Sequence, residues 1–245
     1  MDKNIKIYEQ WWENNILHRL EDMEQWFGDK KENLRFRKYP HRLIKKMGYE
    51  SILDAGAGLC VDYYGFKKHN PEITYTALDI TPGFVKIGRQ KGINMFQGSI
   101  EKIPFPDDSF DCVYLRDIMR HLQSYEKALK ECIRVCRKEA MVIFCRKLTN
   151  KEENIINYRA DRNLYNNIYS KKKIKEFLNK NKNINFFYFE SIDGKHGPNT
   201  LLRIFKRVSI LEKYKIYICT RKYRTYMYWD IQLFCKLLNN SIKKR

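Results

Sequence analysis

Short apolar runs alternate with amphipathic stretches through the central part of the chain. The apolar runs have the length of buried strands, which we expect at Ile52–Asp54, Ile73–Asp79, Ile93–Gln97, Phe110–Leu115 and Ala140–Cys145. The stretches between them have helical length, and one of these helices should be capped by Thr81 and end near Gly92. Strands that alternate with helices predict a parallel sheet covered on both faces.

The pattern changes after this region. Residues 151–182 are expected to form two helices, the second of them capped by Ser170. Two further strands, Asn185–Ile192 and Leu201–Val208, lie too close together in sequence for a crossover helix to connect them. They should therefore be antiparallel, which predicts a mainly parallel sheet with one reversed strand near its edge.

Two appendages flank this α/β domain, which we place at residues 49–208. Residues 1–48 should form an N-terminal helical cap, because apolar side chains recur at helical spacing at Tyr8, Trp11, Trp12, Ile16 and Leu20. Pro40 should open the last helix of this cap, and Gly48 should end it. Residues 209–245 form a basic C-terminal extension rich in tyrosine.

Composition narrows the class of protein. No apolar run reaches the roughly 18–20 residues of a membrane span, and the N-terminus lacks the apolar core of a secretory signal. We therefore expect a cytoplasmic protein. The seven cysteines and five histidines show no zinc-site spacing, so no metal is expected. His18, His41, His69 and His196 have no motif around them and are expected to be structural.

The formal charge of +19 makes nucleic acid a candidate partner. Enrichment in Lys, Asn and Ile throughout the chain accounts for part of this charge without a polyanionic partner. The charge is uneven, however, since residues 206–245 hold 11 Lys and Arg against two acids. If the protein binds RNA, this segment should be the docking surface, with tyrosines available to stack on bases.

The segment Ser51–Cys60 has the pattern of a buried strand that ends in a tight turn against a ligand. Asp54 closes the apolar run, and Gly56 and Gly58 remove side chains where the backbone must turn and approach that ligand. The third glycine of a dinucleotide-binding turn is absent, with Cys60 near its place. A carboxylate before the glycines disfavours a pyrophosphate and favours a cationic cofactor.

A second acid, Asp79, ends the next expected strand, 21 residues after Gly58. A carboxylate at this place accepts hydrogen bonds from both hydroxyls of a ribose. The alternative is a surface acid that caps the helix after Thr81. Together with the turn, Asp79 indicates a ribose-bearing cofactor across two adjacent strand ends.

A third segment points to a family. The run from Gly98, Ser99 and Ile100 through Pro104-Phe-Pro-Asp-Asp-Ser-Phe-Asp111 precedes an expected strand. Together with Ile52-Leu-Asp-Ala-Gly-Ala-Gly58 and Asp79, it resembles a class I S-adenosylmethionine-dependent methyltransferase of the small-molecule type. The resemblance covers roughly residues 40–210. It departs from the family pattern at Cys60, where a glycine is usual, and at Ser99, where an acid is common.

The resemblance implies a fold and a set of cofactor contacts. The fold would be a Rossmann-like seven-stranded sheet of strand order 3-2-1-4-5-7-6 with strand 7 antiparallel. The residues implied to contact S-adenosylmethionine are Asp54, Ala55, Gly56 and Gly58 at the methionine end, Asp79 and Ile80 at the ribose, Ser99 and Ile100 at the adenine, and Arg116 closing the pocket.

The acceptor of the methyl group is the least determined part of this prediction. Asp117 and His121 follow the fourth strand, where the acceptor pocket opens in such folds, and His121 is the better general base by intrinsic pKa. A structural His121 is an equal alternative. The predicted function is methyl transfer to an O or N atom of a small-molecule or glycan-type acceptor. An RNA methyltransferase and a non-catalytic binding or scaffold protein remain as alternatives.

Overall fold

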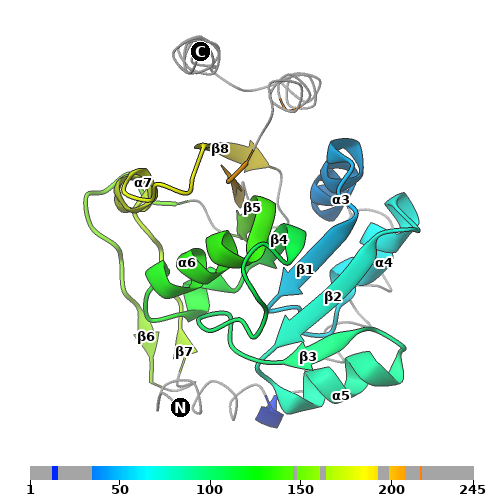
Figure 1. The fold of residues 1–245 in the computed structure, drawn as a ribbon. Coiled ribbons are helices and arrows are strands. Elements are labelled where there is room, and N and C mark those ends of the chain that lie inside the picture. The colour runs from blue at the N-terminus through cyan, green and yellow to red at the C-terminus, as the bar shows by residue number, and fades with distance from the viewer. Residues whose placement is uncertain are drawn as a thin grey trace, which may run out of the picture.

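A seven-stranded sheet with helices on both faces forms the centre of the protein (Figure 1). The computed structural model describes residues 13–15, 35–145, 148–160, 164–192, 199–207 and 216. The main elements in chain order are α3 (Arg35–Met47), β1 (Ser51–Ala55), α4 (Val61–His69), β2 (Thr74–Asp79), α5 (Pro82–Gln90), β3 (Met95–Gln97), β4 (Phe110–Arg116), the 3-10 turn η1 (Met119–His121), α6 (Glu126–Val135), β5 (Cys136–Phe144), β6 (Tyr158–Arg159), β7 (Leu164–Tyr165), α7 (Lys171–Asn179), β8 (Phe186–Ile192) and β9 (Asn199–Phe205).

The sheet has the predicted topology. Its strand order is β3-β2-β1-β4-β5-β9-β8, and β9 is antiparallel to both of its neighbours. The short pair β6–β7 lies outside this sheet, so the seven strands numbered along the chain have the order 3-2-1-4-5-7-6. Because β1, β2 and β4 are parallel, their carboxyl ends meet at one edge of the sheet.

Two apolar layers cover the sheet. Ile52 of β1 packs with α3, α4 and α5, whereas Leu53 packs with α6 and α7 on the opposite face. This alternation follows from the two-residue period of a strand. Both residues are fully buried, as expected for the middle of a parallel sheet. The predicted helices on both faces are therefore confirmed.

Two predicted features of the helices hold and one does not. Gly48 follows α3 with a φ of 71°, and Ser170 caps α7 by accepting a hydrogen bond from the Lys173 N–H. The prediction that Pro40 opens its helix is wrong, because α3 begins at Arg35 and Pro40 lies inside it. The buried Pro40 ring contributes apolar burial there, which offsets the backbone donor that proline lacks.

The helix predicted before Ser170 is also absent from the described residues. Residues 155 and 168 pair across an antiparallel bridge instead, and β6 and β7 form a short hairpin beyond it. Asparagine side chains supply the reason: Asn167 Oδ1 accepts from the Asn157 N–H, and Asn154 Oδ1 accepts from the Ser170 N–H. Such bonds compete with the helical hydrogen bonds of the backbone.

Several predictions fall outside the described residues. They include the aromatic stripe Tyr8, Trp11 and Trp12, His18, His196 and nearly all of residues 209–245, so the two proposed appendages remain predictions. In the part of the chain that the structure describes, no helix is long and apolar enough to cross a membrane. The same part contains no group of three or more His, Cys, Asp or Glu side chains able to hold a metal ion.

Candidate functional site

The turn between β1 and α4 lies at the carboxyl edge of the sheet. The N–H groups of Gly56 and Ala57 both donate to the Leu78 carbonyl, at 2.8 and 3.0 Å, which ties the turn to the end of β2. Gly56 and Gly58 have φ values of 77° and 54°, a region that glycine enters without strain. A Cβ on Gly58 would meet no atom within 4 Å, so this side of the turn is open to a ligand.

Cys60 keeps the backbone geometry expected of a glycine at this place. Its φ is 55°, in the left-handed region, although it carries a side chain. The thiol is buried, and Sγ lies 3.5 Å from Met95 Sδ. Burial raises the pKa of this thiol to about 12, so it stays protonated at neutral pH. The departure from the family pattern therefore leaves the turn intact.

Asp79 links the turn to the next helix. One carboxylate oxygen accepts from the Gly58 N–H at 2.7 Å, and the other accepts from the Thr81 N–H at 2.9 Å. The side chain is buried with 6% of the residue exposed, and burial raises its pKa although these backbone bonds oppose the change. Each carboxylate oxygen can accept more than one hydrogen bond, so Asp79 retains capacity for a ligand's hydroxyls.

Asp54 lies beneath the same turn. Its Oδ2 accepts a hydrogen bond from the Tyr75 hydroxyl at 2.6 Å, and 3% of the residue is exposed. Burial, followed by the nearby Asp62 carboxylate, raises the pKa of Asp54 to about 7. A cationic group placed next to Asp54 would favour its ionised form.

Replacing Asp54 with Asn should stabilise the cofactor-free protein at alkaline pH. An unfolded Asp has a pKa of about 3.9, so between roughly pH 4 and 7 the folded protein binds more protons than the unfolded chain. Stability should therefore fall as the pH rises through this window, and Asn removes that loss. We expect the Asp54→Asn variant to gain about 1–3 kcal/mol at pH 8 and almost nothing near pH 4.

Urea unfolding of both proteins at these two pH values measures the difference. Equal pH dependence in the wild type and the variant would contradict the assigned pKa of Asp54.

Residues near β3 complete this edge of the sheet. The Gly98 N–H donates to the Asp79 carbonyl at 2.9 Å, which brings Ser99 and Ile100 beside the end of β2. Ser99 is half-buried, and its hydroxyl accepts from the Glu101 N–H. Ile100 is buried and Ile80 is half-buried. The structure thus brings the expected adenine contacts next to the expected ribose contact.

Arg116, at the end of β4, is held by an acid that the sequence did not single out. Its Nε lies 2.7 Å from Asp62 Oδ2, and Asp62 Oδ1 lies 2.9 Å from His41 Nε2. Asp62 belongs to the first turn of α4 and is buried. His41, expected to have no partner of this kind, is part of the same group. The sequence analysis did not consider Gly65 inside α4, where the structure places the His41 ring against the helix.

Asp117 and His121 lie just beyond β4 but differ in their surroundings. Asp117 has a left-handed φ of 58° and forms an ion pair with Arg120 at 2.9 Å, with 31% of its side chain exposed. His121 Nδ1 lies 3.0 Å from the Tyr165 carbonyl, and its Nε2 lies 3.2 Å from Arg120 Nε. A carbonyl only accepts, so Nδ1 carries the proton and Nε2 accepts from Arg120. This geometry favours Asp117 over His121 as the group that meets an acceptor.

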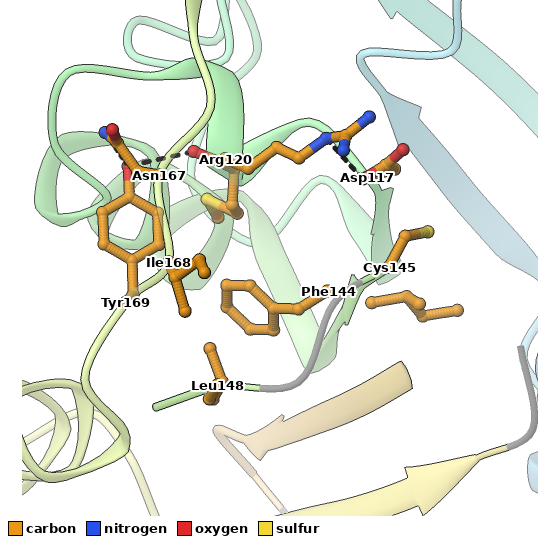
Figure 2. A pocket seen from close by; sticks show the side chains of 10 residues that line it. Asp117, Arg120, Phe144, Cys145, Leu148, Asn167, Ile168 and Tyr169 are labelled. Carbon is orange, nitrogen blue, oxygen red and sulfur yellow. Dashed lines mark hydrogen bonds and ion pairs between the residues drawn. The ribbon is translucent and has the colours of Figure 1, made fainter. Parts of the chain in front are cut away.

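A pocket opens at the carboxyl ends of β4 and β5 (Figure 2). In Figure 2 the side chains of Arg120 and Asp117 face each other on one side, and Asn167 and Tyr169 stand on the other. The Tyr169 hydroxyl and the Asn167 amide donate to the Leu122 carbonyl at 2.8 and 2.9 Å, so they fasten the wall of the pocket. Its lining residues are Asp117, Met119, Arg120, Ile143, Phe144, Cys145, Leu148, Asn167, Ile168 and Tyr169.

Comparisons with known proteins point to methyltransferases. Residues 53–144 match the family model described as a methyltransferase domain. Over 115 residues the chain is 27% identical to a demethylmenaquinone methyltransferase of Listeria welshimeri, covering 44% of this chain and 49% of that protein. It is 29% identical over 93 residues to an uncharacterized methyltransferase of Bacillus subtilis, covering 36% and 37%. The chain thus spans about half the length, or less, of these curated relatives.

A solved structure shares the fold. The 1,6-didemethyltoxoflavin-N1-methyltransferase of Burkholderia thailandensis, solved with 1,6-didemethyltoxoflavin and S-adenosylhomocysteine, covers 82% of this chain with a TM-score of 0.58. Of that protein 89% is covered, at 14% sequence identity. Residues 53–144 are therefore similar to a methyltransferase domain, and the seven-stranded sheet has the strand order that the resemblance to class I S-adenosylmethionine-dependent methyltransferases implies. The match over residues 53–144 and the shared fold support the family that the sequence motifs indicate.

Proposed function

We propose that this protein binds S-adenosylmethionine across the carboxyl ends of β1 and β2 and transfers its methyl group to an O or N atom of a small-molecule or glycan-type acceptor. The observation that carries the proposal is the Asp79 carboxylate, which is fixed by two backbone N–H groups beside the open face of Gly58. A rigid carboxylate next to an open glycine turn suits a ribose with two free hydroxyls.

The proposed cofactor contacts follow the edge of the sheet. Asp79 accepts from the ribose hydroxyls, while Ile80, Ser99 and Ile100 surround the adenine. The open turn, formed by Asp54, Ala55, Gly56 and Gly58, faces the methionine end, which Arg116 closes. The buried carboxyl groups of Asp54 and Asp79 lie at this site, and a cationic ligand beside them would favour their ionised forms.

The pocket in Figure 2 is the proposed acceptor site. When bound, S-adenosylmethionine supplies a methyl group that is activated by a positively charged sulfur. The chain's own task is then to align the acceptor atom and exclude water, which the apolar side chains Met119, Phe144 and Ile168 would do. Asp117 would take the proton of an acceptor that arrives protonated, with Arg120 orienting its carboxylate. His121 would help to fix the Arg120 side chain by accepting a hydrogen bond from Arg120 Nε.

Fewer observations bear on the chemical class of the acceptor than on the cofactor. Demethylmenaquinone and 1,6-didemethyltoxoflavin, which appear in the names of two similar proteins, are small molecules and favour a small-molecule acceptor. The RNA alternative depends on residues 206–245, almost all of which lie outside the described residues, and stays a prediction. The scaffold alternative rested on Cys60 and Ser99, and the left-handed backbone of Cys60 weakens it.

Methyl transfer tests the proposal directly. The full-length protein should incorporate label from methyl-labelled S-adenosylmethionine into a small-molecule fraction of a cell extract, and mass spectrometry should locate the methyl group on O or N. The Asp117→Asn variant should transfer the methyl group at least ten times more slowly to a protonated acceptor, because the proton acceptor is lost. Label found only in RNA, or in no fraction, would contradict the proposed acceptor class.

A further inference from the structure

Two buried side chains and the half-buried Arg116, from three elements, form a connected group. His41 of α3 contacts Asp62 of α4 at 2.9 Å, and Asp62 contacts Arg116 Nε at 2.7 Å. The side chains of His41 and Asp62 are each 4% exposed, and that of Arg116 is 16% exposed. Asp62 therefore fixes the long Arg116 side chain through the Nε side of its guanidinium group.

The fold gives up stability to build this group. A Cβ on Gly65, in the middle of α4, would lie 2.1 Å from the His41 ring, so the ring occupies the space of a side chain. Glycine inside a helix costs about 1 kcal/mol relative to alanine. Burying Asp62 and Arg116 costs further desolvation, which apolar residues of similar size would avoid. A purely structural role explains such a group poorly.

The free edge of Arg116 is the part that can bind a ligand. A guanidinium has five N–H donors, and the one on Nε is the donor that Asp62 accepts. The structure shows no hydrogen bond from Nη1 or Nη2 of Arg116 to any described residue. Two parallel N–H donors on such an edge match the two oxygens of a carboxylate.

The charges around Arg116 indicate which ligand would supply that carboxylate. Arg116 lies two residues beyond Tyr114, which pairs with Asp54 across β1 and β4. Asp54, Asp62 and Asp79 are all buried at this edge of the sheet, and in their ionised forms they would repel an anion and attract a cation. The cofactor has a sulfonium and an ammonium group, which these acids attract, and one carboxylate, which needs a cation.

We propose that Arg116 binds the carboxylate of the cofactor's methionine part through its Nη donors, and that Asp62 and His41 are positioning residues that hold Arg116 for this contact. The inference rests on the proposed function, because it requires S-adenosylmethionine in the site. It adds two points to the proposed function. The cofactor's carboxylate is the group that Arg116 recognises, and Asp62 and His41 hold Arg116 in the position that this recognition needs.

Decarboxylated S-adenosylmethionine, which lacks only this carboxylate, provides the test. Calorimetric titration of the full-length wild type should give at least tenfold tighter binding of S-adenosylmethionine, although the decarboxylated form has the greater positive charge. In the Arg116→Met variant this preference should fall at least tenfold, with most of the change in the affinity for S-adenosylmethionine. The Asp62→Asn variant retains the arginine but not its anchor, and its preference should fall at least threefold.

Controls keep the result interpretable. Arg137 forms an ion pair of similar length with Asp111, at 2.8 Å, near the amino end of β5 and away from the proposed site, so Arg137→Met should leave the preference unchanged. Since Arg116→Met leaves the buried Asp62 without its cation, the double variant Arg116→Met/Asp62→Asn serves where the single variant fails to fold. The preference of the wild type for S-adenosylmethionine over its decarboxylated form can be measured without any variant.

Two outcomes overturn different statements. Equal or tighter binding of the decarboxylated form by the wild type, or a preference that Arg116→Met or the double variant leaves within twofold, would overturn the inference alone. No binding of either compound by the wild type would overturn the proposed function as well.

Discussion

The Asp79→Ala variant should bind S-adenosylmethionine 10–100-fold more weakly than the wild type. In the proposed complex Asp79 accepts from the ribose hydroxyls, and charge-assisted hydrogen bonds of this kind contribute about 1–3 kcal/mol. Alanine also removes the acceptor for the Gly58 and Thr81 N–H groups, which hold the turn against β2. S-adenosylhomocysteine contains the same ribose, so its affinity should fall by a similar factor.

Calorimetric titration measures this loss, and two further variants separate its causes. Asp79→Asn retains one acceptor oxygen, so it should preserve the turn better and lose less affinity than alanine. Asp107 has an exposed carboxylate paired with Arg134, so Asp107→Ala should leave the affinity unchanged. An unchanged dissociation constant in Asp79→Ala would remove Asp79 from the cofactor site.

The Arg203→Met variant should be destabilised by about 3–5 kcal/mol, the largest stability effect that we expect. Arg203 and Glu139 are fully buried, and Arg203 Nη2 donates to Glu139 Oε2 at 2.7 Å. The Tyr49 hydroxyl donates to the same oxygen, and Arg203 Nη1 donates to the Tyr188 hydroxyl. Without the arginine, Glu139 remains as a buried carboxylate with no cation.

Urea unfolding of three proteins tests this account. The double variant Arg203→Met/Glu139→Gln removes both charges and retains an acceptor for Tyr49, so it should recover more than half of the loss. A loss of less than about 1 kcal/mol in Arg203→Met would contradict the expected cost of leaving the buried Glu139 without its cation. The pair lies between β5 and β9, away from the carboxyl ends of β1 and β2, so cofactor affinity should not change.

The sheet could be predicted from sequence because its signals are local. The apolar runs fix the strands, and the short connection between β8 and β9 leaves only an antiparallel pairing. The turn after β1 could be predicted for the same reason, since Asp54, Gly56 and Gly58 lie within five residues of one another. Residues 151–168 misled the prediction because asparagine side chains bond to the backbone there, and the residue pattern does not show which partners they find.

The group around Arg116 could not be predicted in the same way. His41 and Asp62 are 21 residues apart, and Asp62 and Arg116 are 54 apart, so only the folded chain brings them together. His41 was expected to be structural because no acid lies near it in sequence. His121 shows the converse case: its position after β4 suggested a base, and the structure surrounds it with Arg120 and the Tyr165 carbonyl.

In the proposed complex, the turn after β1 and the Asp79 side chain bind S-adenosylmethionine. Calorimetric titration of the full-length wild type with S-adenosylmethionine, and separately with S-adenosylhomocysteine, tests it most directly. We predict saturable binding of both at one site per chain, with dissociation constants of roughly 1–100 μM, in the range common for enzyme ligands. No saturable heat with either compound up to about 1 mM, at pH 7 to 8 where Asp54 can ionise, would contradict the claim.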